Sequence, residues 1–584
     1  MDDLNKGGNI LKRKSIFITS LVLFLFIFAT TVLAVDQEVQ QANAIKFGIF
    51  TLLPPLIAIV LAFITKNVVL SLFVGVFSGA FLLNLNGINI FSGIFYGFLR
   101  VIEEILGSLA DPWNAGIILQ CLAIGGMIAL ITKMGGAKAI AESLSKKAKT
   151  KTSAQLITWF LGICVFFDDY ANSLIVGPIM RPITDKMKIS REKLSFIVDA
   201  TAAPIAGIAL ISTWVGYELG LIKDGFESID ALQGVTIKPY NIFIETIPYR
   251  FYNILILVFI VFTAVMLREF GPMLTAERRA RETGKVLRDG AKPMISDEAT
   301  DLQPVEGIKL KVSNALVPIL VLVVGAFAGF YYNGYVAISG GEDTVLIELL
   351  KTRPVSSYAI RECFGASDAA IVLFQAALLS GIVAMIMGVS QKIFTVSEAI
   401  DTWVSGMKSL LITGVILLLA WSLSAVIKEL GTAVYLVEKV LAIKFPAFLL
   451  PSLIFILGSI ISFATGTSYG TMGILMPLTI PLAYALDPTH SFVVVAISAV
   501  LTGAIFGDHC SPISDTTILS SMGAAADHLD HVKTQLYYAL VVAAVAVICG
   551  YIPAGLGMPI WLILPIDIVI IGVIVRFVGK KVEA

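Results

Sequence analysis

Long apolar runs constrain the fold of this chain more than any other feature of its sequence. A run that crosses a hydrocarbon core of roughly 30 Å needs about 20 apolar residues in a helix. Only 14% of the 584 residues are charged, against roughly 25% in an average soluble domain. The sequence therefore predicts an all-α polytopic membrane protein with about 11–12 transmembrane helices. The predicted spans are 47–65, 68–86, 115–133, 194–216, 252–268, 314–333, 367–388, 408–427, 492–524, 536–553 and 559–577.

Several classes of protein are disfavoured by the remaining composition. The 42 basic residues balance the 42 acidic residues, so no excess of positive charge points to nucleic acid. The five cysteines are scattered singly, which predicts neither a disulfide framework nor a zinc site. No nucleophile–base pair or metal-ligand spacing is apparent, so we expect no enzyme and no cofactor other than a transported ion.

The N-terminus has the pattern of a secretory signal. Lys12, Arg13 and Lys14 precede an apolar run at 16–29, and the residues 32–34 (VLA) then offer a small-residue cleavage site. We expect residues 1–44 to form a signal peptide or a retained signal-anchor helix.

Basic loops predict the orientation of the spans, because Lys and Arg accumulate on the cytoplasmic side. The loop 271–312 and the loop 181–193 are both basic, and so is the stretch 146–151. Since both flanks of the segment 154–180 are basic, we expect that segment to be a re-entrant hairpin that turns near Asp168 and Asp169. The basic loops and the C-terminus are then cytoplasmic in a cell (inner) membrane protein.

An internal repeat relates the two halves of the chain. A shift of 296 positions brings Gly162 onto Gly458 and Gly177 onto Gly473, and after a short insertion downstream Pro204 falls on Pro512. The loop charges give the halves opposite orientations. We therefore predict two inverted repeats, each with a re-entrant hairpin and a broken transmembrane helix, which is the pattern of a secondary transporter. The predicted domains are 45–270 and 313–555, separated by the loop 271–312 and followed by a C-terminal span and cytoplasmic tail at 556–584.

The first hairpin carries two adjacent carboxylates, Asp168 and Asp169, followed by Asn172 and Ser173. A carboxylate at mid-membrane costs about 2.5–3.5 kcal/mol on insertion scales, and a proton or a cation bound there lowers the cost. Alternatively, one Asp caps the returning helix and the other pairs with a basic residue.

The second hairpin, at 447–482, has hydroxyls and glycine but no charge around its turn. Thr465, Thr467 and Ser468 are candidate oxygen ligands for a small cation. The alternative is a small-residue face for helix packing.

Prolines mark the two broken spans. In the first, Thr201 lies just before Pro204; the second contains two carboxylates and a histidine. His509 is a candidate proton carrier or a structural hydrogen-bonding group, whereas His528 and His531 are expected in a solvated turn. The second-half candidates for the site are Asp508, His509, Ser511, Ser514, Asp515 and Thr516.

These motifs resemble the NhaC-type sodium/proton antiporter family of the ion transporter superfamily. The resemblance rests on residues 166–172 (FFDDYAN), on 507–517 (GDHCSPISDTT), and on 519–521, 527–528 and 531–535. It implies a secondary transporter with two hairpins and two broken helices around its site, and by analogy a homodimer. A long loop at 334–366 looks like an addition to the shared core.

We expect exchange of sodium for protons by alternating access. Sodium would bind at Asp168, Asp169, Asn172, Thr465 and Thr467. Because the family also contains carriers of organic acids and amino acids, the alternative is a sodium- or proton-coupled transporter of such a small molecule.

Overall fold

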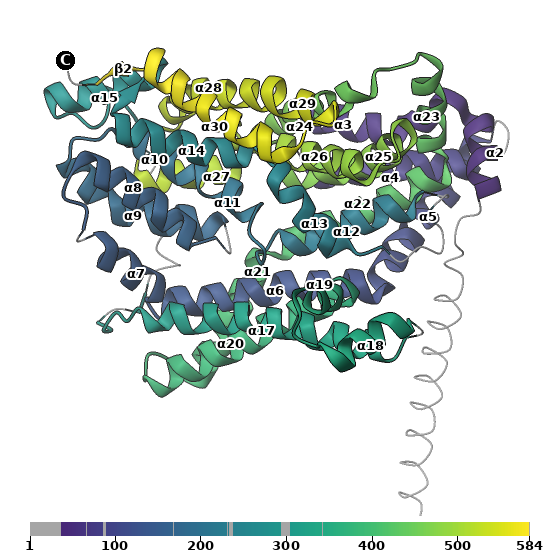
Figure 1. The fold of residues 1–584 in the computed structure, drawn as a ribbon, viewed down its shortest axis with the longest axis horizontal. Helices are drawn as coiled ribbons and strands as arrows, with labels where there is room; N and C mark the ends of the chain where they lie inside the picture. The colour runs from purple at the N-terminus through teal and green to yellow at the C-terminus, as the bar shows by residue number, and fades with distance from the viewer. Residues whose placement is uncertain are drawn as a thin grey trace, which may run out of the picture.

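The computed structural model describes residues 37–65, 67–85, 89–145, 147–166, 169–229, 232, 237–293, 304–305, 307–341 and 343–582 (Figure 1). Most of the predicted signal or anchor segment lies outside these residues, and so does Asp168.

Helices account for nearly all of the described chain, as predicted. The first half contains α2 (Gln37–Phe47), η1 (Gly48–Leu52), α3 (Leu53–Thr65), α4 (Val68–Leu83), α5 (Ile90–Ala110), α6 (Pro112–Lys133), α7 (Gly136–Ser145), α8 (Lys151–Cys164), α9 (Asp169–Lys186), α10 (Arg191–Ala200), α11 (Ala203–Ala206), α12 (Val215–Glu227), α13 (Pro239–Thr246), η3 (Ile247–Tyr249) and α14 (Phe251–Met266). After it come α15 (Gly271–Thr283), α17 (Ser313–Ser339), α18 (Thr344–Thr352), α19 (Ser357–Ala366), α20 (Ala369–Ser390), α21 (Val396–Ser409), α22 (Leu411–Glu429), α23 (Thr432–Ala442), η4 (Ala447–Leu449), α24 (Leu450–Thr465), α25 (Ser468–Leu486), α26 (His490–Cys510), α27 (Asp515–Ala524), α28 (His528–Val545), the π-helical η5 (Ala546–Tyr551), α29 (Ile552–Gly555) and α30 (Ile560–Phe577).

Ten helical segments of the described chain are long and apolar enough to cross a membrane. The bent pair Pro239–Tyr249 and Phe251–Met266 raises the number to eleven. The number equals that of the predicted spans, but two members differ: both helices of the segment 447–482 are included, whereas the predicted spans 68–86 and 194–216 are not. The chain is a multi-pass membrane protein.

Four long helices form a layer along the lower part of Figure 1. Helices α6, α17, α20 and α21 pack side by side there. Glycine allows the closest approach in this layer, since a Cβ at Gly125 of α6 would lie 2.6 Å from the carbonyl oxygen of Gly406 in α21. None of the predicted site residues lies on these four helices.

The prediction of a long loop at 334–366 is wrong, because most of this segment is helical. Helix α17 continues to Ser339, and α18 and α19 follow it. Both short helices have side-chain N-caps: Asp343 accepts from the N–H groups of Val345 and Leu346, and Ser356 accepts from that of Ala359. These caps satisfy first-turn N–H groups that have no acceptor within the helix itself.

Helical hairpins occupy both interrupted segments. Helices α8 and α9 form the first, and α24 and α25 form the second, with its turn at Gly466 and Thr467. Gly466 has φ +69°, and a Cβ there would lie 2.7 Å from the carbonyl oxygen of Ile513. The turn therefore requires glycine for its left-handed backbone and for its approach to the second broken span.

The open ends of the first hairpin lie at the same end of the molecule. Burial and the positive charges of Arg281 and Lys188 lower the pKa of Lys151, at the start of α8. Lys188 follows directly after α9, and Arg281 belongs to α15. The start of α8 and the end of α9 therefore lie at the same end of the molecule.

Both proline-containing spans are broken. The first consists of α10, α11 and α12 with non-helical residues at 207–214, and the second consists of α26 and α27 with a break at 511–514. The first helix of each hairpin packs on the broken span of its own half: a Cβ at Gly162 would overlap Thr201, and one at Gly507 would lie 2.6 Å from Ser462 Cβ.

The second helix of each hairpin crosses to the other half. In α9, a Cβ at Gly177 would lie 2.6 Å from the carbonyl carbon of Gly523 in α27. In α25, a Cβ at Gly473 would lie 2.8 Å from the hydroxyl of Tyr217 in α12. Gly177 and Gly473 are the residues that the repeat alignment pairs.

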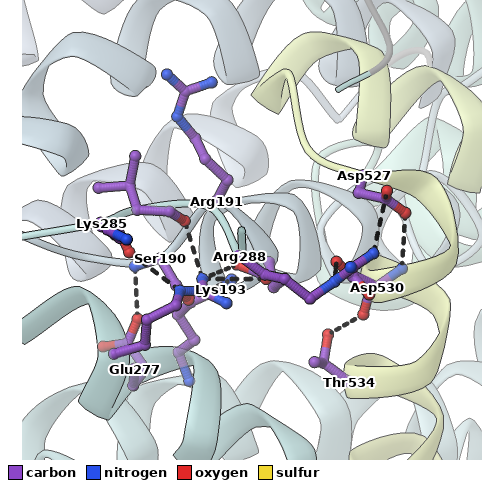
Figure 2. Close-up of polar contacts among 12 residues, drawn as sticks. Ser190, Arg191, Lys193, Glu277, Lys285, Arg288, Asp527, Asp530 and Thr534 are labelled. Carbon is purple, nitrogen blue, oxygen red and sulfur yellow. Dashed lines mark hydrogen bonds and ion pairs between the residues drawn. The ribbon is translucent and has the colours of Figure 1, made fainter. Parts of the chain in front are cut away.

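The basic loop and the C-terminal strand lie together at one end. Strand β1 (Arg268–Glu269) pairs antiparallel with β2 (Lys580–Lys581). The Ser190 N–H donates to Glu277 Oε1 of α15 at 2.7 Å, and Arg288 Nε donates to Asp530 Oδ2 of α28 at 2.7 Å (Figure 2). The loop therefore links the start of α10 to the start of α28.

Candidate functional site

The break between α26 and α27 is held by hydroxyl groups. Ser511 Oγ donates to the carbonyl oxygen of Phe463 in the second hairpin at 2.7 Å. Ser468 Oγ, on the first residue of α25, donates to Asp508 Oδ2 at 2.8 Å. Pro512 lacks an N–H donor and helps to end α26. The second hairpin tip and the second break thus form one hydrogen-bonded unit.

Asp508 contributes a buried carboxylate to this unit. Its side chain is 5% exposed, and Oδ1 makes no hydrogen bond within the described chain. An unpartnered, buried carboxylate oxygen carries a desolvation cost that a proton or a cation removes. The arrangement can therefore hold either of these ligands.

The first hairpin reaches the same break. The Tyr170 hydroxyl donates to Asp515 Oδ2 at 3.4 Å, and the hydroxyls of Ser173 and Ser520 are 3.0 Å apart. Asp169 is buried at the first turn of α9, where the helix dipole favours a negative charge. The structure thus brings the two predicted sources of carboxylate, the first hairpin and the second broken span, side by side.

The first break is closed by stronger contacts. Asn172 Nδ2 donates to the carbonyl oxygens of Gly162 at 2.7 Å and Thr201 at 2.6 Å. Arg250 donates to the carbonyl oxygen of Gly207 and pairs with Glu218 at 2.7 Å, with both side chains fully buried. Asn172 Oδ1 is buried without a hydrogen bond in the described chain.

The other predicted residues occupy different environments. Thr465 Oγ1 lies 3.4 Å from the carbonyl oxygen of Ser462, and the carbonyl oxygen of Thr467 accepts from Ser462 Oγ at 3.1 Å. The hydroxyls of Ser514 and Thr516 are 3.0 Å apart. Of the four predicted residues, Thr465 and Thr467 lie at the second hairpin tip, Ser514 lies in the second break, and Thr516 lies in the first turn of α27.

His509 faces away from Asp508. Its Nδ1 lies 2.6 Å from the hydroxyl of Tyr252 in α14, whereas Asp508 contacts Ser468 in α25. Consecutive helical residues point in different directions, so the two side chains belong to different surroundings. Within the residues that the structure describes, no group of three or more His, Cys, Asp or Glu side chains is arranged to hold a metal ion.

The expectation of a solvated turn is wrong for His531. This side chain is fully buried, and its Nδ1 lies 2.8 Å from both Ser195 Oγ and Ser521 Oγ. Helix α28 packs on α10 and α26, which covers the histidine.

Two further buried polar residues were not among the predicted ones. Gln535 Nε2 donates to Asp199 Oδ2 at 2.7 Å, and both side chains are fully buried. A signal for Asp199 was present, since it lies just before the proline of the first broken span, as Asp508 does in the second.

Two hairpins set against two broken helices within a multi-pass bundle define a polytopic membrane transporter. The model of the Na+/H+ antiporter family matches residues 205–556, and the chain belongs to this family. The resemblance drawn from the motifs is thereby confirmed. The chain is accordingly a cation/proton antiporter by family, and not a member of an enzyme family.

The chain is similar to other proteins over very different lengths. An uncharacterized protein of Haemophilus influenzae is 32% identical over 527 residues, which are 90% of this chain and 95% of that protein. The malate-2H+/Na+-lactate antiporter of Bacillus subtilis is 38% identical over 112 residues, 18% of this chain and 23% of its own. The Na+/H+ antiporter NhaC of Alkalihalophilus pseudofirmus is 38% identical over 81 residues, 13% of this chain and 16% of its own.

The fold is also similar to that of a solved transporter. The YdaH transporter of Alcanivorax borkumensis superposes with a TM-score of 0.55 at 15% identity, over 87% of this chain and 99% of that one. At this identity the likeness concerns the fold alone.

Proposed function

We propose that this chain exchanges sodium for protons across the cell membrane by alternating access. The observation that carries the proposal is the buried carboxylate of Asp508, whose Oδ1 has no hydrogen-bond partner in the described chain. A charged carboxylate inside a membrane costs at least about 2.5–3.5 kcal/mol. Either a proton or a sodium ion relieves this cost, and the two compete for the same oxygens. Binding of one ion then releases the other.

The remaining ligands are oxygens, as sodium prefers. Ser468 Oγ already contacts Asp508. Asp169 begins α9 next to Tyr170, which reaches Asp515 in the second break. Together with Asp168, the remaining candidates for the sodium shell are Asn172, Thr465 and Thr467.

Alternating access is supported by the way the hairpins cross between the halves. Helix α9 packs on α27, and α25 packs on α12, so movement of one half displaces a hairpin of the other. We propose that 45–270 and 313–555 are inverted repeats that rock against each other around the site. The loop 271–312 joins them, and 556–584 adds a final span and a tail.

The clustered positive charge indicates how the protein is oriented in the membrane. The basic loop, the open ends of the first hairpin and β2 lie at one end of the molecule. Because positive loops stay in the cytoplasm, we place this end inside the cell.

The test uses purified protein in liposomes that enclose a pH-sensitive dye. A sodium gradient should drive proton movement in the wild type, and Asp508→Asn and Asp169→Asn should abolish it. Asp567→Asn is the matched control, because Asp567 is a fully buried carboxylate in α30, outside the site, whose oxygens also make no hydrogen bond in the described chain. Normal exchange by Asp508→Asn would contradict the proposal.

A second candidate function has the same fold but a different transported substrate. The match to the malate-2H+/Na+-lactate antiporter of Bacillus subtilis favours it, and the hydroxyls around Ser468 and Ser511 suit a small carboxylate as well as an ion. If a sodium gradient alone moves no protons in the wild type, the same liposomes should be supplied with small organic acids and amino acids. Proton movement that requires such a solute would establish this alternative.

A further inference from the structure

Buried polar side chains connect Asp199 to the start of α28, beyond the residues of the proposed cation site. Gln535, His531 and Ser521 are fully buried, as is Asp199. His528, the first residue of α28, is half-buried. Isolated polar groups are costly in a membrane protein interior, so a continuous row of them calls for a role.

The hydrogen bonds fix the tautomer of His531. Gln535 Nε2 donates to Asp199 Oδ2 at 2.7 Å and also to the carbonyl oxygen of His509. The amide oxygen of Gln535 must then face His531 Nε2, which lies 2.9 Å away. Since an amide oxygen only accepts, Nε2 carries the hydrogen and Nδ1 has a free lone pair.

A hydroxyl joins the two histidines. Ser521 Oγ lies 2.8 Å from His531 Nδ1 and 3.0 Å from His528 Nδ1. In the resting arrangement the same hydroxyl also donates to the carbonyl oxygen of Thr517 at 2.8 Å, and it turns from this carbonyl to a histidine when it passes a proton. His528 Nε2 lies 2.7 Å from the carbonyl oxygen of Pro512, so it also carries a hydrogen and leaves Nδ1 as the acceptor. A hydroxyl between two lone pairs can pass a proton in either direction, because it accepts from one nitrogen while it donates to the other.

We infer that His528, Ser521 and His531 conduct protons between the start of α28 and Asp199. A proton enters on His528 Nδ1 and moves to Ser521 Oγ while the Ser521 hydroxyl proton moves to His531 Nδ1. His531 Nε2 then releases its hydrogen to Asp199 Oδ2, which is 3.7 Å away. The imidazole returns neutral in the other tautomer, so the number of protons is conserved at each step.

Little basic charge surrounds the inner end of this route, at Asp199. His531 is the one basic side chain within ion-pair distance of Asp199 in the part of the chain that the structure describes. The titratable groups that face the route from neighbouring helices are Asp508, His509 and Cys510 of α26 and Tyr252 of α14. The charged groups at the other end of α10 are already paired, as in Lys193–Glu269 at 2.9 Å, Arg191–Asp185 and Arg279–Glu192.

The outer end of the route opens beside the basic loop. Asp527 and Asp530 flank His528 and contact Arg288 of that loop (Figure 2). In the proposed orientation this end faces the cytoplasm, so the route would connect cytoplasmic water to the interior. The inference rests on the proposed exchange of sodium for protons, and adds the path that the proton takes.

Two serines on the same nitrogen provide a matched pair of variants. Ser521 and Ser195 each place a hydroxyl 2.8 Å from His531 Nδ1, but only Ser521 also contacts His528. Ser521→Ala interrupts the route and also removes the bond to the carbonyl oxygen of Thr517. Ser195→Ala removes the other hydroxyl contact of His531 Nδ1 and leaves the route intact. His531→Gln retains hydrogen bonding and removes the transferable proton.

The variants should be compared in liposomes in two modes. The first is sodium/proton exchange, followed with an internal pH dye; the second is exchange of radioactive sodium for unlabelled sodium at equal pH, which requires no proton. Ser521→Ala and His531→Gln should slow the first mode by about 100-fold, as for loss of a positioned proton-transfer group. Both should leave the second mode at the wild-type rate, and Ser195→Ala should leave both modes unchanged.

Three results would overturn the inference. The first is sodium/proton exchange at the wild-type rate in Ser521→Ala and His531→Gln. The second is an equal loss of sodium/proton and sodium/sodium exchange in these two variants, and the third is a loss of sodium/proton exchange in Ser195→Ala as large as that in Ser521→Ala. The equal loss would mark a structural role. If the wild type itself exchanges no sodium in either mode, the proposed function fails and the proton route fails with it. Failure of the route alone leaves wild-type exchange intact, so the two failures are distinguishable.

Discussion

The two broken spans interrupt similar helices but are stabilised by different chemistry. In the first, a fully buried ion pair between Arg250 and Glu218 also binds the carbonyl oxygen of Gly207, and Asn253 donates to that of Pro204 at 2.9 Å. In the second, serine hydroxyls hold the break, and Asp508 has no cation among the described residues within ion-pair distance.

This difference indicates that the first break is a rigid structural element and that the second break is a binding element. In the first break the charges of Arg250 and Glu218 compensate each other inside the protein. In the second, the charge of Asp508 is left for a ligand to compensate. Substitutions in the first break should therefore change stability, whereas those at Asp508 should change ion binding.

The largest effect on stability is expected for Glu218→Gln. It leaves the buried guanidinium of Arg250 without its charge partner, and breaking a buried ion pair from one side costs about 3–5 kcal/mol. Thermal unfolding in detergent should show a strongly lowered Tm and little folded protein. A Tm equal to that of the wild type would mean that the first break is not held by this pair.

An intermediate effect is expected for Gly507→Ala, which forces α26 away from the second hairpin. A Cβ at Gly507 would lie 2.6 Å from Ser462 Cβ and 2.7 Å from the Phe463 nitrogen. Overpacking of this kind costs about 1–3 kcal/mol. Gly107→Ala in α5 is the control, since a Cβ there meets nothing within 4 Å, and the same thermal measurement should leave its Tm unchanged or raised.

The smallest effect on stability is expected for Asp508→Asn. The Ser468 contact can persist with an amide oxygen, so the free energy of unfolding should change by no more than about 1 kcal/mol. The sodium dependence should change completely, because ligand binding raises the stability of the wild type and the variant has lost its ligand. Unfolding scans with and without sodium check both parts, and a Tm of Asp508→Asn that still rises with sodium would place the ion elsewhere.

The sequence predicts the framework of the fold well, because the membrane imposes strong rules on it. Apolar runs indicate the spans, and the prolines at 204 and 512 mark the breaks. The basic flanks of the first hairpin and the glycine at position 466 indicate the two turns. Hydropathy does not indicate α18 and α19 within 334–366, because they have only 9 and 10 residues.

The site is less predictable, because it depends on which helices meet. Asp508, Ser468 and Asp515 stand out as polar residues in apolar runs. Whether Asp508 and His509 face one cavity or two depends on the packing of α14 and α25 around α26, which the order of residues does not give. Asp199 and His531 come together only because α28 covers α10, so the buried state of His531 could not be seen in a polar stretch near a helix start.

The most direct test is to count the protons released when sodium binds to the purified protein. Sodium should be titrated calorimetrically into the wild type and Asp508→Asn, in buffers of different ionisation enthalpy. If sodium and a proton compete for Asp508, the wild-type heat will change with the buffer, and Asp508→Asn will give neither heat nor proton release. Sodium binding by the wild type without proton release, or unchanged release by Asp508→Asn, would contradict the proposed exchange site.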